Sequence, residues 1–567
     1  MQAPGGIADI LGRAQRAALA GRLGEAETLF RQAARAAPRD PRPISALGDV
    51  AMARGEIDKA VEGYRAALKL APGVAEIGVN LLAALRRGER LAEAETAGRA
   101  LLRRHPRHVP LLGNLALVLA DLGRLEEARK LYERALPLRP DSVDLLTNFG
   151  NLLRDLGDPE AALAWFDRAL ALKPRQPEVL YLKATLLERL SRLEEAEAVL
   201  EAGSGLKHPG MALTAARLAA RRGDRARAIA LLEPERPGPH WQGDWCYARH
   251  FDLGQLYDAE GDAARAFEHF AEGNRLQGLS ATGRRAPKEA FLAGIDRLER
   301  WVEAVGRPDW LASPLPEGPE AAPAFLVGFP RSGTTLLDQF LSGHPAITVL
   351  EEKALLAEAR PRDYPDSLAT LDAGRIEELR QRYWDAVRKE GVEPGAGRLI
   401  VDKLPLNLVE VPLIQRLFPS ARFILALRHP CDCVLSCFMQ QFRLNTAMAN
   451  FLTLEGAATL YDRAFGLWRR YEAAFPLQVQ ALRYEDLIAD PEAVARPLVA
   501  FLGLDWHAGL LDHVKTARGR RIDTPSYRQV TEPLHGRAKG RWRRYESQMA
   551  AVLPLLRPWI EAFGYDE

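Results

Sequence analysis

The residues from Phe325 to Thr335, with the sequence FLVGFPRSGTT, have the layout of a phosphate-binding loop. A short apolar strand is predicted to enter a loop bounded by Gly328 and Gly333, and a helix follows it. The N-terminal N–H groups of that helix, together with its dipole, would face a bound anion. Thr334 stands where a nucleoside-triphosphatase loop needs Lys, and the loop carries its cation at Arg331 instead. The pattern therefore favours a diphosphate-like anion over ATP with magnesium, and an unliganded glycine turn is the alternative.

The loop resembles a known family of enzymes. The sequence PRSGTT, from Pro330 to Thr335, is similar to the 5′-phosphosulfate loop of sulfotransferases that use 3′-phosphoadenosine 5′-phosphosulfate (PAPS), above all the protein-tyrosine sulfotransferases. The resemblance covers about residue 325 to the C-terminus. It implies a P-loop-like three-layer α/β domain with a parallel sheet, PAPS as the co-substrate and no metal. The loop residues that it assigns to the cofactor are Arg331, Ser332, Gly333, Thr334 and Thr335.

Further cofactor residues follow from the same resemblance. An apolar run that we predict to be a strand ends in Arg428, and Ser436 lies eight residues later. This pair looks like the family's 3′-phosphate motif, in which the guanidinium acts as a fork for phosphate oxygens. The family has a second Arg where this chain has Gln440, which leaves the strength of 3′-phosphate binding open. Tyr484 matches a Tyr at the nucleotide, although core packing would explain it equally well, and Arg541 stands where the family has a Lys near the 3′-phosphate.

The resemblance also implies a set of catalytic residues. Glu352 aligns with the catalytic base, which would take the proton from a phenol that is neutral at pH 7. Lys403, in the sequence IVDKLPLN, and Arg331 would neutralise charge on the bridging oxygen, so that no metal is needed. Ser526 lies in a C-terminal segment that looks like the loop over the cofactor, with a plain surface tail as the alternative. The family's Arg two residues after the base is Ala354 here, which leaves open how the acceptor is held.

Small, aromatic and proline residues recur in the first half of the chain with a spacing of 34 residues. The period resembles tetratricopeptide repeats, in which each repeat is a helical hairpin and a small Ala lets two helices approach. An aromatic residue fills the gap to the next repeat, and Pro ends the second helix. The recurring residues are Gly21, Gly55, Gly123 and Gly157; Ala26, Ala60, Ala94, Ala128, Ala162 and Ala196; Phe30, Tyr64, Tyr132 and Phe166; and Pro38, Pro72, Pro106, Pro140 and Pro174.

These patterns predict an α-helical solenoid followed by an α/β domain. We expect the tetratricopeptide α-solenoid over residues 1–280, with five good repeats and three degenerate ones, the last around Ala266 and Phe270. Residues 281–323 should form an amphipathic helix, Lys288 to Val305, and a Pro-rich interdomain linker. Residues 324–567 should form the sulfotransferase domain.

Asn80, Asn114 and Asn148 also lie 34 residues apart, each at the sixth position of the first helix of its repeat. That face lines the inside of the superhelix, where carboxamides can pair with the backbone of an extended peptide. We therefore predict a peptide groove. The alternative is that these side chains only hydrate the concave surface, because Ala46 and Leu182 interrupt the series on either side.

Composition restricts the partners. Lys plus Arg (77) nearly balances Asp plus Glu (75), so the sequence predicts no nucleic-acid binding. No apolar run reaches the length of a membrane span and the N-terminus lacks a signal pattern, so we expect a cytoplasmic protein. Cys431, Cys433 and Cys437 crowd into seven residues without partners spaced for zinc, and buried reduced thiols are expected.

The sequence as a whole predicts a PAPS-dependent sulfotransferase. The predicted acceptor is a hydroxyl, first of all tyrosine in a peptide or protein held partly by the repeats. A carbohydrate or small metabolite is the second acceptor class, and a non-catalytic tetratricopeptide scaffold is the alternative from another class. Repeat domains also serve dimerisation, so a homodimer remains open.

Overall fold

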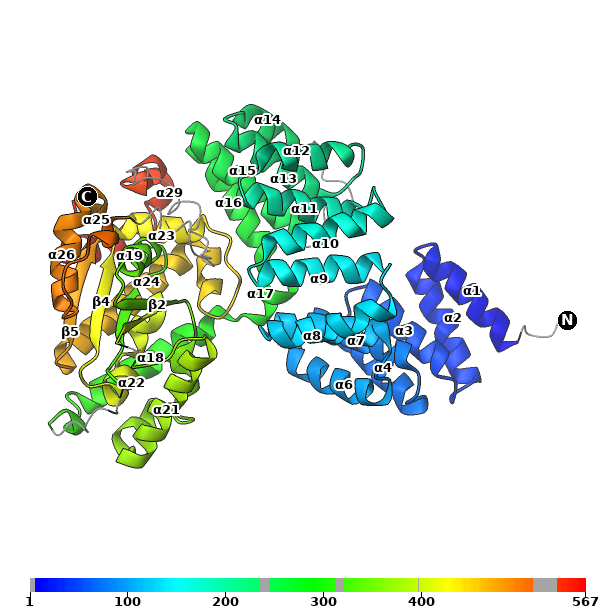
Figure 1. The fold of residues 1–567 in the computed structure, drawn as a ribbon, viewed down its shortest axis with the longest axis horizontal. Helices are drawn as coiled ribbons and strands as arrows, with labels where there is room; N and C mark the ends of the chain where they lie inside the picture. Colours follow the sequence, from blue (N-terminus) through cyan, green and yellow to red (C-terminus); the bar gives the residue numbers. More distant parts are fainter. Residues whose placement is uncertain are drawn as a thin grey trace. The chain divides into compact units, whose positions relative to one another are not determined.

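The computed structural model describes residues 6–233, 244–312, 318, 320–395, 397–512 and 538–566. The chain forms two compact units, residues 1–240 and residues 241–567. The first unit is built from helices, and the second contains the β-sheet (Figure 1).

The helices of the first unit follow one another as antiparallel pairs, as expected for helical hairpins. Their bounds are α1 Ile7–Leu19, α2 Leu23–Ala36, α3 Pro41–Ala53, α4 Ile57–Leu70, α5 Ala75–Arg87, α6 Leu91–Arg104, α7 Val109–Asp121, α8 Leu125–Ala135 with the 3-10 turn η1 Leu136–Leu138, α9 Val143–Asp155, α10 Pro159–Leu172, α11 Pro177–Arg189, α12 Leu193–Ala202, α13 Pro209–Arg221 and α14 Arg225–Leu232.

Packing inside the pairs confirms the tetratricopeptide prediction. All six alanines of the 34-residue series, Ala26 to Ala196, are 0% exposed, as close helix–helix approach requires. A Cβ added at Gly48 would lie 2.7 Å from the ring of Tyr64, and one at Gly150 would lie 2.8 Å from Phe166. The small residue and the aromatic ring are therefore complementary parts of one contact.

The turns inside the pairs also repeat. Gly21, Gly55, Gly123 and Gly157 have φ between 74° and 87°. Glu89 and Ser191 occupy the same place in the two repeats that lack the glycine, and they adopt φ of 54° and 61°. Left-handed backbone at a non-glycine residue carries a steric cost, so packing of the neighbouring helices imposes this turn.

One further helix pair belongs to the second unit. Helices α15 (Asp244–Glu260) and α16 (Ala263–Gly278) keep the repeat chemistry, because an added Cβ at Gly254 would lie 2.7 Å from Phe270. Their contacts, however, run to the α/β part: the carboxamide of Asn274 donates to Phe438 O at 2.8 Å. The two compact units divide before this pair, and the predicted end of the solenoid at residue 280 stays a prediction. Helix α17 (Ala281–Arg285) follows, and α18 spans Lys288–Val305, as predicted.

The sheet has five parallel strands in the order β2-β3-β1-β4-β5. The strands are β1 Ala324–Gly328, β2 Ile347–Glu351, β3 Leu399–Lys403, β4 Arg422–Leu427 and β5 Gln478–Arg483; the helices that follow are α19 Thr334–Ser342, α20 Leu355–Ala359, α21 Ala373–Lys389, α22 Val411–Leu417, α23 Pro430–Phe438, α24 Leu454–Ala474, α25 Tyr484–Ala489, α26 Pro491–Phe501, α29 Glu546–Met549 and α30 Leu553–Ala562.

Helices cover both faces of the sheet, which confirms the three-layer prediction. Side chains of β1 alternate between the faces: Leu326 joins a core cluster with α19, α25 and α26. Phe325 points the other way, toward Tyr383 of α21 and Phe418 after α22. Because β1 is central and the chain order reverses beside it, the carboxyl ends of β1, β3 and β4 form the edge where ligands bind in such folds.

Candidate active site

The loop between β1 and α19 is shaped by its two glycines. A Cβ at Gly328 would lie 2.5 Å from Ala426 O of the neighbouring strand, and Gly333 has φ of 97°. A Cβ at Gly333 would also lie 2.7 Å from the ring of Tyr484. Only glycine fits at these two points, and the resulting turn directs the N–H groups at the start of α19 toward the edge of the sheet.

Arg331 connects this loop to two residues that are about 100 positions away in the sequence. Its Nε donates to Ser436 Oγ at 3.1 Å, and its backbone carbonyl accepts from Arg428 Nη1 at 3.0 Å. Burial and the nearby Arg428 charge lower the pKa of Arg331 to about 10. The structure therefore brings Arg331, Arg428 and Ser436 together, and a bound anion would relieve the repulsion between the two guanidinium groups.

The loop and its neighbours fit the anion that the sequence implies. Ser332 Oγ and Arg428 Nε are buried, and neither has a hydrogen-bond partner in the described part of the chain. Such groups cost free energy unless a ligand or water satisfies them. The Arg428 guanidinium also lies 5.3 Å from the centre of the Tyr484 ring. A donor set of two guanidinium groups, hydroxyls and backbone N–H groups suits phosphate or phosphosulfate oxygens.

The three clustered cysteines are explained by packing behind this loop. All are unbonded to other cysteines and buried, and the thiols of Cys433 and Cys437 both donate to Pro330 O at 3.2 Å. Burial raises the pKa of Cys433 to about 12, so the thiol stays protonated. The expectation of buried reduced thiols is confirmed. Within the described ranges there is also no group of three or more His, Cys, Asp or Glu that could hold a metal ion.

Glu352 and Lys403 meet at the ends of the neighbouring strands β2 and β3. Lys403 Nζ lies 3.0 Å from Glu352 Oε1 and 3.3 Å from Glu351 Oε1. The side chain of Lys403 is 0% exposed and that of Glu351 is 9% exposed, whereas that of Glu352 is 40% exposed. Glu352 has φ of 50°, a strained conformation that turns it out of the strand while its N–H donates to Lys403 O.

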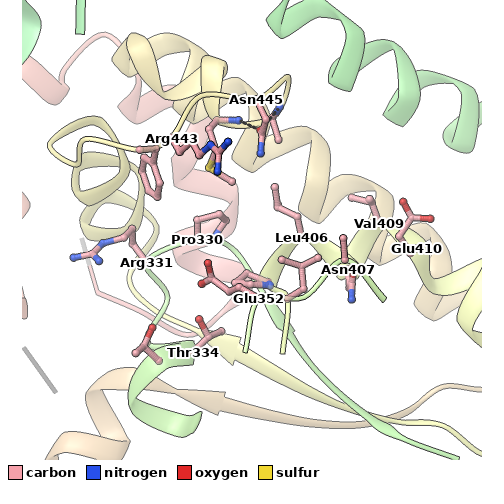
Figure 2. A pocket seen from close by; sticks show the side chains of 18 of the residues that line it. Pro330, Arg331, Thr334, Glu352, Leu406, Asn407, Val409, Glu410, Arg443 and Asn445 are labelled. Atoms are coloured by element: carbon pink, nitrogen blue, oxygen red, sulfur yellow. Dashed lines mark hydrogen bonds between the residues drawn. The ribbon is translucent and has the colours of Figure 1, made fainter. Parts of the chain in front are cut away.

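A cavity of about 800 Å³ opens beside these residues (Figure 2). Arg331, Thr334 and Glu352 line one part of it. The remaining wall was not singled out from the sequence, and it is mainly apolar. It contains Phe291, Leu356, Leu404, Leu406, Val409, Phe442 and Met448, with the polar residues Arg360, Asn407, Glu410, Arg443 and Asn445.

The sequence held one signal for this wall. Asn407 lies in the motif IVDKLPLN, which also contains Lys403. It follows the last residue of strand β3 by four positions. Residues 442–448 come from a segment without a regular pattern, so their place in the cavity depends on tertiary folding alone.

The other predicted site residues line the cavity, lie buried behind it, pair with another helix or fall outside the described residues. Thr335, Arg428 and Tyr484 line the cavity, whereas Lys403, Ser332 and Ser436 are buried behind it. Arg541 pairs with Asp258 at 2.7 Å. Ser526 lies outside the described residues.

His344 and His429 have structural partners. His344 accepts from Ala346 N at Nδ1, so its Nε2–H donates to Asp505 O at 2.9 Å. His429 accepts from Cys431 N at the start of α23. Both rings are therefore held by the backbone and are unsuited to act as a base.

The asparagine series in the first unit is only partly bonded to the chain itself. Asn80 Nδ2 donates to Asp49 Oδ1 at 3.2 Å, and Asn114 Nδ2 donates to Pro110 O at 3.0 Å. Asn80 also lines a hollow of about 580 Å³ with Glu76 and Arg107. The carbonyl oxygens of these amides remain the groups through which a peptide N–H could be held.

The fold and the loop together define an α/β unit whose first loop has the layout of a phosphate-binding loop, and helical repeats precede this unit. Comparison with known proteins agrees. Residues 323–508 match the model of the sulfotransferase family. Residues 108–175 match one tetratricopeptide-repeat model, and residues 11–75, 45–107 and 147–205 match another. The chain therefore contains a segment similar to sulfotransferases, preceded by segments similar to tetratricopeptide repeats.

Individual relatives are similar at low identity. An uncharacterised protein of Aquifex aeolicus is 31% identical over 253 residues, which cover 42% of this chain and 33% of the relative, so the match spans about a third of that protein. Protein-tyrosine sulfotransferase 1 of Danio rerio is 24% identical and is matched over 43% of this chain and 72% of its own length. A tetratricopeptide repeat protein from Parabacteroides merdae, known as a crystal structure, is 21% identical with a TM-score of 0.35 over 42% of this chain and 93% of its own.

No helix in the described ranges combines the length and the apolar character that crossing a membrane requires.

Proposed function

We propose that the second unit transfers a sulfuryl group from PAPS to a hydroxyl acceptor, and that this acceptor is tyrosine in a peptide or protein. One observation carries the proposal. The phosphate loop with Arg331 and the carboxylate of Glu352 line the same cavity, so an anion site and a base face one space. A scaffold that does not catalyse would have no need for this combination.

The residues at the loop would bind and orient the donor. PAPS supplies an activated sulfuryl group, and no metal is required for the transfer. The N–H groups at the start of α19 and the guanidinium of Arg331 would hold the 5′ end, with Arg428 and Ser436 on the 3′-phosphate side. Preorganised cations of this kind stabilise the negative charge that develops on the leaving oxygen.

Glu352 would act on the acceptor. A phenol has a pKa near 10, so its oxygen needs a base to become a good nucleophile at neutral pH. The 40% exposed side chain of Glu352 can reach a bound hydroxyl, while Lys403 Nζ holds the carboxylate in place from 3.0 Å away. Leu356, Leu406 and Val409 offer apolar wall for an aromatic ring. The repeats support a polypeptide acceptor, because such surfaces commonly bind extended chains.

The donor site is tested by calorimetric titration with adenosine 3′,5′-bisphosphate, beside ATP with magnesium. We expect binding of the bisphosphate without metal, and its loss in Arg428→Ala. A preference for ATP with magnesium, or no binding at all, would overturn the proposal.

The acceptor is tested separately by transfer of ³⁵S from labelled PAPS. Tyrosine peptides, a panel of sugars and small phenols are compared at equal concentration, with Glu352→Gln as the blank. Label on the peptides supports the proposal. Label on sugars alone would assign the carbohydrate class instead.

A further inference from the structure

Asp258, on the repeat-type helix α15, is the meeting point of three side chains from the C-terminal segment. Its carboxylate lies 2.7 Å from Arg541 Nη2 and 3.0 Å from Arg544 Nη2, and it accepts from Tyr545 OH at 2.6 Å. Asp258 is buried, and so is the ring of Tyr545. A buried carboxylate that is this fully bonded fixes its partners much more firmly than a surface ion pair does.

The same segment lies directly against the anion site. Arg428 Nη2 donates to Ala538 O at 2.7 Å, and Ala538 lines the cavity. Two and four residues further along the chain, Gly540 N and Trp542 N donate to the two oxygens of Asp432 at 2.6 and 2.8 Å. Asp432 belongs to α23, the helix that also carries Ser436.

Arg541 therefore has its backbone neighbours held by α23 and its side chain held by α15. Its Nε and Nη2 both face Asp258, at 3.3 and 2.7 Å, in a forked arrangement. A fork of this type fixes the plane of the guanidinium and directs the remaining N–H groups away from the carboxylate. The charge of Arg541 also contributes to the lowered pKa of Arg331, which places Arg541 within electrostatic reach of the loop.

The helix pair α15 and α16 makes three further contacts on this side. Asn274 and Gln277 of α16 are buried and donate to Phe438 O at 2.8 Å and to Phe442 O at 2.7 Å. Phe267 stacks on Phe438, with ring centres 4.9 Å apart. The pair α15 and α16 therefore fixes both the C-terminal end of α23 and the segment around Arg541.

We propose that Asp258 is a positioning residue that orients Arg541 toward the 3′-phosphate of the donor, so that a helix pair of the repeat type forms part of the nucleotide site. This inference rests on the proposed function. It gives the helix pair α15 and α16 a role in donor binding, and this role is separate from the predicted peptide groove and from the phosphate loop.

The test compares two ligands by calorimetry on the full chain: adenosine 3′,5′-bisphosphate and adenosine 5′-monophosphate. Asp258→Asn keeps the shape of the side chain but removes the charge that holds the fork. We expect it to weaken bisphosphate binding about 10-fold, the size of one lost charged hydrogen bond, and to leave monophosphate binding unchanged. Arg541→Ala should give the same selective loss, and the double variant should be no worse than Arg541→Ala alone.

Two matched variants act as controls. Tyr545→Phe removes another hydrogen bond to the same carboxylate but leaves the fork, and Asp262→Asn changes an exposed cap on the same hairpin. Neither should alter the ratio of the two affinities. If Asp258→Asn weakened the binding of both ligands equally, the role of Asp258 would be only structural. Unchanged or tighter binding of the bisphosphate would also overturn the inference. If the wild-type chain does not distinguish the two ligands, the proposed donor itself fails.

Discussion

Lys403 Nζ lies 3.0 Å from Glu352 Oε1, yet the lysine side chain is fully buried behind the two carboxylates that it bridges. The cation therefore approaches Glu352 from inside the sheet, while the carboxylate faces the cavity. This relationship fixes the position of the Glu352 carboxylate at the edge of the cavity, because Lys403 holds one of its oxygens from the side of the sheet. The predicted action of Lys403 on the bridging oxygen stays a prediction, since Lys403 does not line the cavity.

Glu352→Gln should abolish most of the turnover and leave donor binding intact. The amide cannot accept the acceptor's proton, and general-base catalysis contributes about 10²- to 10⁴-fold to rate. We expect a fall in kcat of about that size, measured with labelled PAPS, with an unchanged Kd for the bisphosphate. Glu351→Gln is the matched control, because Glu351 is buried and does not line the cavity. A loss of activity in Glu351→Gln as large as that in Glu352→Gln would contradict the assignment of the base.

Lys403→Met should destabilise the fold as well as the site. The change leaves Glu351 buried without its cation, and breaking a buried pair costs about 3–5 kcal/mol. Burial already raises the pKa of Glu351, and loss of Lys403 would raise it further. A raised folded-state pKa means that stability is present at low pH and is lost as the pH rises through that pKa. Urea denaturation at pH 5 and pH 8 should therefore show a smaller penalty at pH 5. An equal penalty at both pH values would exclude this coupling.

The local parts of the site could be predicted from the sequence. Gly328, Gly333 and Arg331 lie within six residues, and the structure assembles them around one turn. The 34-residue period likewise fixes which alanines are buried, because each repeat packs only on its neighbours.

The distant parts could not be predicted in the same way. Asp258 and Arg541 are 283 positions apart, and no local pattern connects a helix of the repeat type to the C-terminal segment. The boundary between the units is another example. The sequence of α15 and α16 retains the small and aromatic residues of a repeat, whereas Asn274 and Gln277, which tie this pair to the second unit, carry no periodic signal.

Asp402 should make the stability of the second unit depend on pH. It is 0% exposed beside Tyr383 and Asn407, and burial raises its pKa to about 7. Because the folded state holds this proton more tightly than the unfolded chain, stability should fall as the pH rises from about 4 to about 7. Asp402→Asn removes the titration, so the difference in unfolding free energy between the two proteins should change by up to about 4 kcal/mol over that range. If guanidinium denaturation gave the same difference in unfolding free energy between the two proteins across that pH range, Asp402 would not titrate within it.

Gly333→Ala should disrupt the phosphate loop. The position has φ of 97°, and an added Cβ would lie 2.7 Å from the ring of Tyr484, so the loop or the ring must move. We expect bisphosphate affinity to fall by about 10-fold or more, because the N–H groups of α19 lose their direction. Gly466→Ala is the control, since Gly466 lies inside α24 with open space around it. That variant should keep full affinity and gain about 0.5–1 kcal/mol of stability. Unchanged binding in Gly333→Ala would contradict the assignment of the loop.

The asparagine series provides a test of the peptide groove. Replacing Asn80, Asn114 and Asn148 with Ala together should raise the KM for a long tyrosine peptide by about 100-fold, because each carboxamide that pairs with a peptide unit contributes about 1 kcal/mol. Donor affinity and kcat should not change, since these residues belong to the first unit. A short tyrosine peptide that contacts the second unit alone is the matched substrate, and its KM should stay the same in the variant. Because Asn80 also donates to Asp49, thermal melting must accompany the kinetics. A normal melting curve together with an unchanged KM for the long peptide would contradict the peptide groove. These side chains would then only hydrate the concave surface.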